Sequence, residues 1–132
     1  MRYPIVIHKD PNSDYGVTVP DIPGCFSAGE TVEEAFDMAR EAILCHIEGL
    51  LIDEESIPAP NSVEKYRTHP DFQNGIFMLV DIDPSEISGA VKRINFTIPE
   101  RILGRLDKYV ALNGGNRSAI LTEAALKLTL DV

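Results

Sequence analysis

The chain of 132 residues contains little cysteine and no long apolar run. Cys25 and Cys45 are the only cysteines, and no apolar leader opens the sequence. Disulfide scaffolds use several cysteines in an oxidising compartment, and a membrane-spanning helix needs about 20 apolar residues. We therefore expect a reduced, cytoplasmic protein without a membrane span, in which neither cysteine forms a disulfide.

The sequence also lacks the usual signatures of a catalytic or metal site. No Ser-His-Asp arrangement and no glycine-rich phosphate loop is visible. Cys45 and His46 are adjacent, so they face about 100° apart on a helix, and no Cys-x-x-Cys pair accompanies them. His8 and His69 are interpreted as surface or packing residues. We expect no cofactor and no bound metal.

Positive charge is scarce in the first two thirds of the chain and concentrated at its end. Residues 1–89 carry 5 Lys and Arg against 17 Asp and Glu, a net charge of −12, whereas residues 90–132 carry 7 against 4, a net charge of +3. This asymmetry indicates two units with separate partners. The basic unit can approach phosphates, and the acidic unit suits a basic protein, although an acidic surface can also serve solubility alone.

The basic end opens with a segment, residues 92–99, in which apolar and polar side chains alternate. The apolar set is Ile94, Phe96 and Ile98, and the polar set between them is Arg93, Asn95 and Thr97. This alternation predicts a strand with one buried face. Pro99 then ends the strand and favours a helix over residues 100–112. Glycines at 114 and 115 and an N-cap at Asn116 indicate a second helix that runs to about residue 130.

One strand and two short helices cannot enclose a core, so this unit needs a second copy of itself. Antiparallel pairing of two such strands would bury the apolar set as a dimer core and expose the polar set on a ribbon that fits the DNA major groove. There Arg93 can bind guanine and Asn95 can pair with adenine, while the start of the second helix offers a seat for phosphate. The predicted DNA-binding residues are Lys92, Arg93, Asn95, Thr97, Asn116, Arg117 and Ser118. The alternative is a strand that only dimerises, with a solvated polar face.

Residues 91–130 resemble the ribbon-helix-helix family of bacterial repressors. The resemblance rests on the alternating strand, the proline that follows it, and the Gly-Asn-Arg-Ser sequence that opens the second helix. It implies a homodimer that binds operator DNA.

The sequence pattern of the acidic unit predicts several strands and one long helix. The expected elements are a strand over residues 3–8, a strand over 15–19, an irregular surface crossing over 20–29, a helix from Thr31 to the acidic turn at Asp53, and a buried strand over 76–82. Thr31 and Glu34 form a capping box at the start of the helix. The short connection between the first two strands predicts an antiparallel hairpin. The helix is long enough to cover a small sheet.

The segment Val19-Pro-Asp-Ile-Pro-Gly-Cys-Phe-Ser-Ala-Gly-Glu-Thr-Val-Glu-Glu-Ala-Phe36, continued through Ile43, closely resembles the HicB antitoxin family. Ile57-Pro-Ala-Pro60 and the strand at Ile76 are similar to it as well. The resemblance implies a partial ribonuclease-H-like ββαβ fold that neutralises HicA, a small basic toxin that cuts messenger RNA. Members carry a helix-turn-helix or a ribbon-helix-helix tail, and the two resemblances together imply that this chain would be of the second kind.

We therefore predict an α+β chain with a toxin-neutralising domain over residues 1–84, a linker over 85–90 and a ribbon-helix-helix domain over 91–132. The predicted protein is a type II antitoxin that binds a HicA-type mRNA interferase and represses its own operon, by binding rather than by catalysis. It would be a homodimer, and pairing of the N-terminal domains would give a tetramer or larger assembly. One alternative is a metal-dependent nuclease in which Asp81 and Asp83 meet Asp21. Another is a transcriptional regulator that responds to a small ligand.

Overall fold

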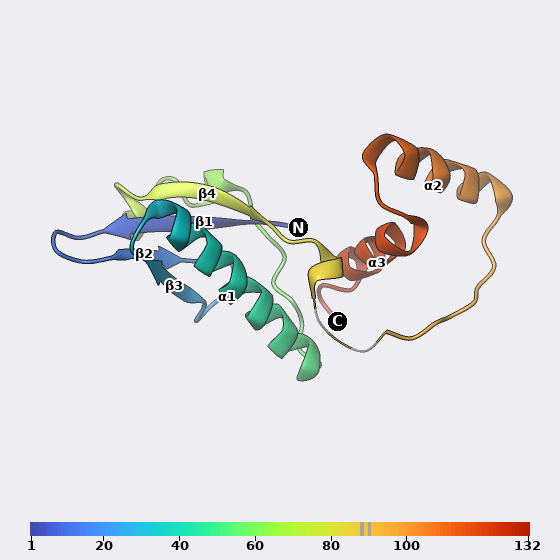
Figure 1. Ribbon diagram of the computed structural model, residues 1–132, viewed down its shortest axis with the longest axis horizontal. Helices are drawn as coiled ribbons and strands as arrows, with labels where there is room; N and C mark the ends of the chain where they lie inside the picture. Colours follow the sequence, from blue (N-terminus) through green and yellow to red (C-terminus); the bar gives the residue numbers. More distant parts are fainter. Residues whose placement is uncertain (88, 90) are drawn as a thin grey trace.

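The computed structural model describes residues 1–87, 89 and 91–132. A four-stranded sheet and one long helix form an N-terminal unit, and two further helices follow (Figure 1). The helices and strands are β1 (Arg2–Lys9), β2 (Tyr15–Thr18), β3 (Phe26–Gly29), α1 (Val32–Ile52), η1 (Val63–Lys65), η2 (Pro70–Phe72), β4 (Ile76–Asp81), η3 (Pro84–Glu86), α2 (Glu100–Asn113) and α3 (Arg117–Leu128).

The sheet is antiparallel throughout, with strand order β3-β2-β1-β4. The predicted hairpin of β1 and β2 is confirmed, and so is a later strand, β4. The prediction that this later strand is buried was wrong, because β4 is an edge strand and Val80 is the one buried residue within it. β1 lies between β2 and β4, and its residues 3–7 are buried on both faces of the sheet. Central strands with two covered faces are continuously apolar, as this one is.

The prediction of an irregular crossing over residues 20–29 was wrong, because β3 lies within it. The N-terminal order is therefore βββαβ rather than ββαβ. β3 has the sequence Phe-Ser-Ala-Gly and contains no β-branched residue, so local preference gave no signal for a strand. Its pairing with β2 decides the structure, with Phe26 opposite Thr18 and Gly29 opposite Tyr15.

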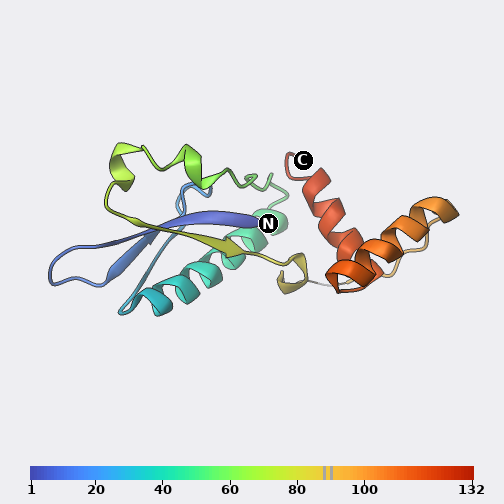
Figure 2. The same cartoon turned by 90° about the horizontal axis from the view of Figure 1, so that it is seen from above.

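The long helix α1 covers one face of the sheet. It begins as predicted, with the Thr31 hydroxyl accepting a hydrogen bond from the Glu34 amide at 3.1 Å. Its buried residues are Ala35, Ala39, Ile43 and Ile47. Figure 2 shows α1 on one side of the sheet and the connection between α1 and β4 on the other. A Cβ on Gly75 in that connection would collide with the side chains of Val6 and His8, so glycine allows the close approach.

Asp21 fastens this connection to the rest of the N-terminal unit. Its carboxylate is buried and accepts a hydrogen bond from the Asn61 amide at 2.9 Å. It also accepts from the Asn61 side-chain amide and from the Tyr66 hydroxyl. A buried carboxylate needs such donors, and these three satisfy it.

Replacement of Asp21 by alanine should lower the free energy of unfolding by about 1–3 kcal/mol, because it removes the buried carboxylate that accepts three hydrogen bonds from Asn61 and Tyr66. Urea denaturation followed by circular dichroism would measure the loss. Asp37→Ala is the matched control: Asp37 is exposed on α1, and its replacement should change stability by less than about 0.5 kcal/mol. Equal stability of the two variants would contradict the structural role of Asp21.

Two tyrosines make the stability of the N-terminal unit sensitive to alkaline pH. Burial raises the pKa of Tyr3 from 10.0 to about 12, and the nearby Asp21 carboxylate adds to the shift. Burial and the hydrogen bond to Asp21 likewise raise the pKa of Tyr66 to about 12. A raised pKa in the folded state means stability that is present below pH 10 and is lost as pH rises toward 12. We expect urea midpoints to fall across this window, and to fall less in Tyr66→Phe.

The two C-terminal helices form as predicted. Gly114 ends α2 with a φ of +80°, and the Asn116 side chain caps α3 by accepting from the Ala119 amide at 2.9 Å. The end of α3 lies against the N-terminal unit, where Leu126 and Leu130 pack on the core around the sheet. The Ile57 amide donates to the Leu130 carbonyl at 2.9 Å. The two parts of the chain are therefore in direct contact.

The predicted linker over residues 85–90 overlaps a short helix. η3 occupies its start, and Ile87 packs against the core. The predicted linker over residues 85–90 includes Ser88 and Ala90, which lie outside the described residues.

Candidate partner-binding surfaces

Residues 91–99 contain no strand in the single chain, because no other segment among the described residues pairs with them. They form an extended, open stretch that leads into α2 (Figure 1). The predicted strand over residues 92–99 is thus not present in one copy of the protein. Every residue from 91 to 97 is exposed, and Ile98 is half-buried.

The C-terminal unit carries a large uncovered apolar surface. Neither α2 nor α3 contains a buried residue. The exposed large apolar side chains of this unit, with their exposed fractions, are Val91 (102%), Ile94 (70%), Phe96 (60%), Ile102 (51%), Tyr109 (50%), Leu112 (82%), Leu128 (85%) and Val132 (84%). Soluble monomers rarely expose so many large apolar residues in one small region. Two of the three predicted dimer-core residues, Ile94 and Phe96, belong to this set.

The predicted base-reading residues share the exposed segment with this apolar set. Lys92, Arg93, Asn95 and Thr97 are all exposed. They alternate with Ile94, Phe96 and Ile98 along the chain, so a strand formed here would put the two sets on opposite faces.

At the start of α3, where a phosphate seat is predicted, Arg117 is paired with an acidic residue of α2. The Arg117 guanidinium donates to both carboxylate oxygens of Asp107 on α2, through Nε at 2.7 Å and Nη2 at 2.8 Å. These hydrogen bonds hold the pKa of Asp107 below its ordinary value. The pair links α2 to α3, and sequence analysis missed it because Asp107 lies ten positions away in another helix. Asn116 and Ser118 are exposed beside Arg117.

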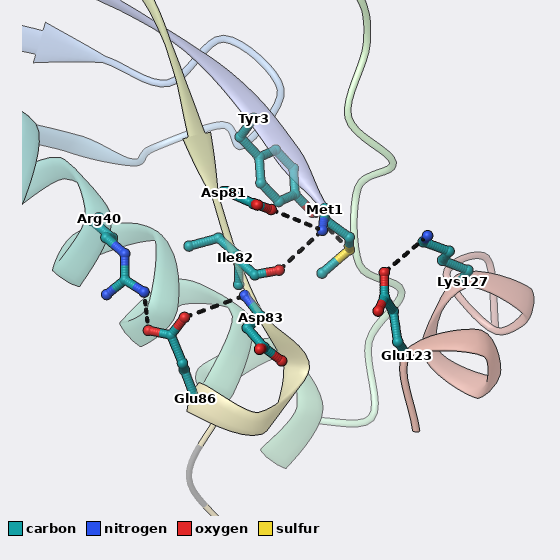
Figure 3. A network of polar contacts seen from close by, with 9 residues as sticks. All are labelled: Met1, Tyr3, Arg40, Asp81, Ile82, Asp83, Glu86, Glu123 and Lys127. Carbon is teal, nitrogen blue, oxygen red and sulfur yellow. Dashed lines mark hydrogen bonds and ion pairs between the residues drawn. The ribbon is translucent and has the colours of Figure 1, made fainter. Parts of the chain in front are cut away.

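The three aspartates of the nuclease alternative have other contacts. Asp21 is buried against Asn61 and Tyr66. The Asp81 carboxylate lies 3.7 Å from the Met1 amine, and the Asp83 amide lies 3.4 Å from a Glu86 carboxylate oxygen (Figure 3). Within the described residues, no group of three or more His, Cys, Asp and Glu side chains could hold a metal ion.

Cys25 is buried and Cys45 is exposed, and both are free thiols. In the part of the chain that the structure describes, no helix combines the length and apolar character that a membrane crossing requires.

The fold and these surfaces define a two-part α+β binding protein. An acidic unit with a four-stranded antiparallel sheet is joined to a basic two-helix unit with uncovered apolar side chains. Residues 3–125 match the family described as HicB_like antitoxin of bacterial toxin-antitoxin system. The chain therefore belongs to this family of antitoxins.

Individual relatives extend the similarity to the whole chain. An uncharacterized 14.9 kDa protein from the rep-hol intergenic region of Haemophilus phage HP1 is 44% identical over 127 residues, which cover 95% of each chain. The crystal structure of the Burkholderia pseudomallei antitoxin HicB superposes with a TM-score of 0.89 at 41% identity, over 97% of this chain and 98% of that one. A chain of the HicA3 and HicB3 toxin-antitoxin complex gives a TM-score of 0.56 at 37% identity, over 64% of this chain and 100% of that one.

Proposed function

We propose that this antitoxin neutralises a HicA-type mRNA interferase with its N-terminal unit and represses its own operon by binding operator DNA as a homodimer. In this proposal residues 1–84 bind the toxin, residues 85–90 link the units, and residues 91–132 form a ribbon-helix-helix domain. The observation that carries the proposal is the uncovered apolar set of the C-terminal unit, which shares one exposed segment with Arg93, Asn95 and Thr97.

A second copy of the chain is the partner that this apolar set fits best. The segment over residues 92–98 has unpaired main-chain groups, and the same segment of a second copy can pair with it antiparallel about a two-fold axis. Ile94, Phe96 and Ile98 of both copies would then pack together against the helices. Burial of a Phe or Ile side chain stabilises such an interface by about 1.5–3 kcal/mol.

Pairing of the strands would make Arg93, Asn95 and Thr97 a polar ridge with two-fold symmetry. A two-stranded ribbon of this kind fits the major groove, where arginine and asparagine can recognise guanine and adenine. The unit that carries the ridge has a net charge of +3, which favours approach to phosphates. The DNA phosphate backbone would be bound by Lys92, Asn116, Arg117 and Ser118. Hydrogen bonds to Asp107 would hold the Arg117 side chain in place.

Support for toxin binding comes from the family and from the acidic N-terminal unit. The chain of the HicA3 and HicB3 complex matches 64% of this chain. The net charge of −12 over residues 1–89 suits a basic partner. The effect would be stoichiometric occlusion of the toxin rather than catalysis.

A co-expression assay and a DNA-binding assay test the two halves of the proposal. A HicA-type toxin encoded beside this gene should arrest growth when it is expressed alone, and co-expression of the antitoxin should restore growth. The purified protein should shift a DNA fragment from its own promoter at concentrations that leave a scrambled fragment unbound. Growth arrest that the protein does not relieve would refute neutralisation, and equal binding of both fragments would refute operator recognition.

A further inference from the structure

A groove lies at the edge of the sheet, between the β1–β2 turn and β3. Its volume is about 360 Å³, and its lining includes His8, Asp10, Asp14, Thr18 and Phe26. Phe26 is opposite Thr18 in the register of β2 and β3, and Thr18 is opposite Val6 in that of β1 and β2. Directly opposed residues point to the same face of a sheet, so Phe26, Thr18 and Val6 share one face. Val6 lies against Gly75 of the connection that covers the face opposite α1. Phe26 therefore lies on the face that does not carry α1. We call this site the β3 groove.

Phe26 is the apolar feature of the β3 groove. Its side chain is 68% exposed, although the connection that covers this face of the sheet buries Val6 completely. β3 is also the last strand of the sheet, with β2 as its only neighbouring strand among the described residues. An exposed aromatic side chain beside an unpaired strand edge is a common anchor for a protein partner.

The charge at the β3 groove is negative. Asp10 and Asp14 are exposed in the turn at its end, and neither forms an ion pair within the described part of the chain. The adjacent cation, Lys9, is opposite Tyr15 in the strand register, and its Nζ lies 5.8 Å from the centre of the Tyr15 ring. Since Lys9 and His8 are consecutive in β1, Lys9 points to the other face of the sheet. The two carboxylates are therefore available to cations of a partner.

The opposite edge of the sheet differs in character. β4 exposes Ile76 (46%) and Leu79 (48%), and its one acidic residue, Asp81, lies beside the Met1 amine. That edge is apolar and does not select for a basic partner. Of these two edges, only the β3 groove combines a hollow, an exposed aromatic ring and carboxylates without an ion pair among the described residues.

We infer that the β3 groove is the surface on which the toxin docks, with an apolar toxin side chain against Phe26 and Lys or Arg side chains at Asp10 and Asp14. The inference rests on the proposed function, because it takes the basic partner to be the toxin of the same system. The groove would form the centre of a larger contact, since a stable protein interface buries about 800 Å² on each partner.

Matched variants of the full-length protein test the inference. The groove variants are Phe26→Ser and the double variant Asp10→Asn with Asp14→Asn. The controls on the outer face of α1 are Met38→Ser, which replaces another exposed apolar residue (42%), and Asp37→Asn with Glu41→Gln, which removes the same charge. Binding to a catalytically inactive form of the adjacently encoded HicA-type toxin would be measured by surface plasmon resonance at low and high salt.

Phe26→Ser should weaken toxin binding by at least about tenfold, as expected for an aromatic anchor. The aspartate variant should slow association by about threefold or more at low salt and reduce its salt dependence. Both controls should bind as the unaltered protein does. Hydrogen exchange of the unaltered protein should show protection of residues 8–18 and 26–29 by the toxin, which tests the surface without any substitution.

The outcomes separate the inference from the proposed function. Toxin binding by the unaltered protein, together with undiminished binding by both groove variants, would overturn the inference and leave the proposed function intact. Loss of binding in the α1 variants alone, or protection elsewhere, would also overturn it and move the interface to another face. No toxin binding by the unaltered protein would refute the proposed function and the inference together.

Discussion

Phe96→Asp is expected to convert the protein to a monomer that does not bind operator DNA. In one copy of the chain the Phe96 ring is 60% exposed, in the middle of the segment that we propose pairs with a second copy. Pairing would bury this position from both copies, so the substitution would place two carboxylates in an apolar interface. The desolvation of an unpaired charge costs more than such a contact can supply. Light scattering after gel filtration would give the mass.

Ile52→Asp is the control for this experiment. Ile52 is 80% exposed at the end of α1, so the variant introduces the same charge at another exposed apolar position. Its mass and operator affinity should equal those of the unaltered protein. Phe96→Asp should still relieve toxin-dependent growth arrest, because the N-terminal unit has its own core. A dimer of Phe96→Asp with undiminished operator binding would exclude residues 92–98 as the interface.

Arg93→Ala is expected to cost about 1–3 kcal/mol of operator binding and to relax the preference at one base pair. The loss should be confined to the specific site, because a base contact contributes little on random DNA. Arg117→Ala should instead weaken binding to all sequences, since it removes a charge near the backbone and the contact with Asp107. Titration of operator and random fragments at two salt concentrations would separate the two effects.

Arg67→Ala provides the charge-matched control. Arg67 is exposed in the N-terminal unit and lies 3.2 Å from Glu64, so its loss changes the net charge without touching the proposed DNA surface. Its operator affinity should stay within about twofold of the unaltered protein. If Arg93→Ala and Arg117→Ala weakened operator and random DNA equally, the assignment of base reading to Arg93 would be wrong.

Elements defined by local chemistry could be predicted from the sequence. Thr31 and Glu34 marked the start of α1, and Asn116 marked that of α3, because a cap depends on residues three positions apart. β3 could not be predicted, since its strand form depends on pairing with β2 rather than on its own residues. The segment over residues 92–99 shows the reverse case, in which a clear strand pattern has no partner in the same chain.

Some features of the candidate site could likewise be predicted from the sequence, and others depend on the fold. The alternation of Arg93 with Phe96 and its neighbours is visible in the sequence and led to the DNA-binding prediction. The contacts of Asp107 with Arg117 and of Asp21 with Tyr66 join residues from separate elements, so only the fold reveals them. The exposure of Phe26 likewise depends on where the connection over residues 57–75 stops covering the sheet.

The contact between Ile57 and Leu130 bears on how the protein would sit on a promoter. This hydrogen bond and the packing of Leu126 and Leu130 hold the end of α3 on the sheet unit. The two units are therefore joined by contacts as well as by the chain between them. Two copies joined through their tails would present their sheet units at a spacing set by the molecule itself. In the proposed homodimer, this fixed attachment would limit how closely two neighbouring dimers could bind along operator DNA.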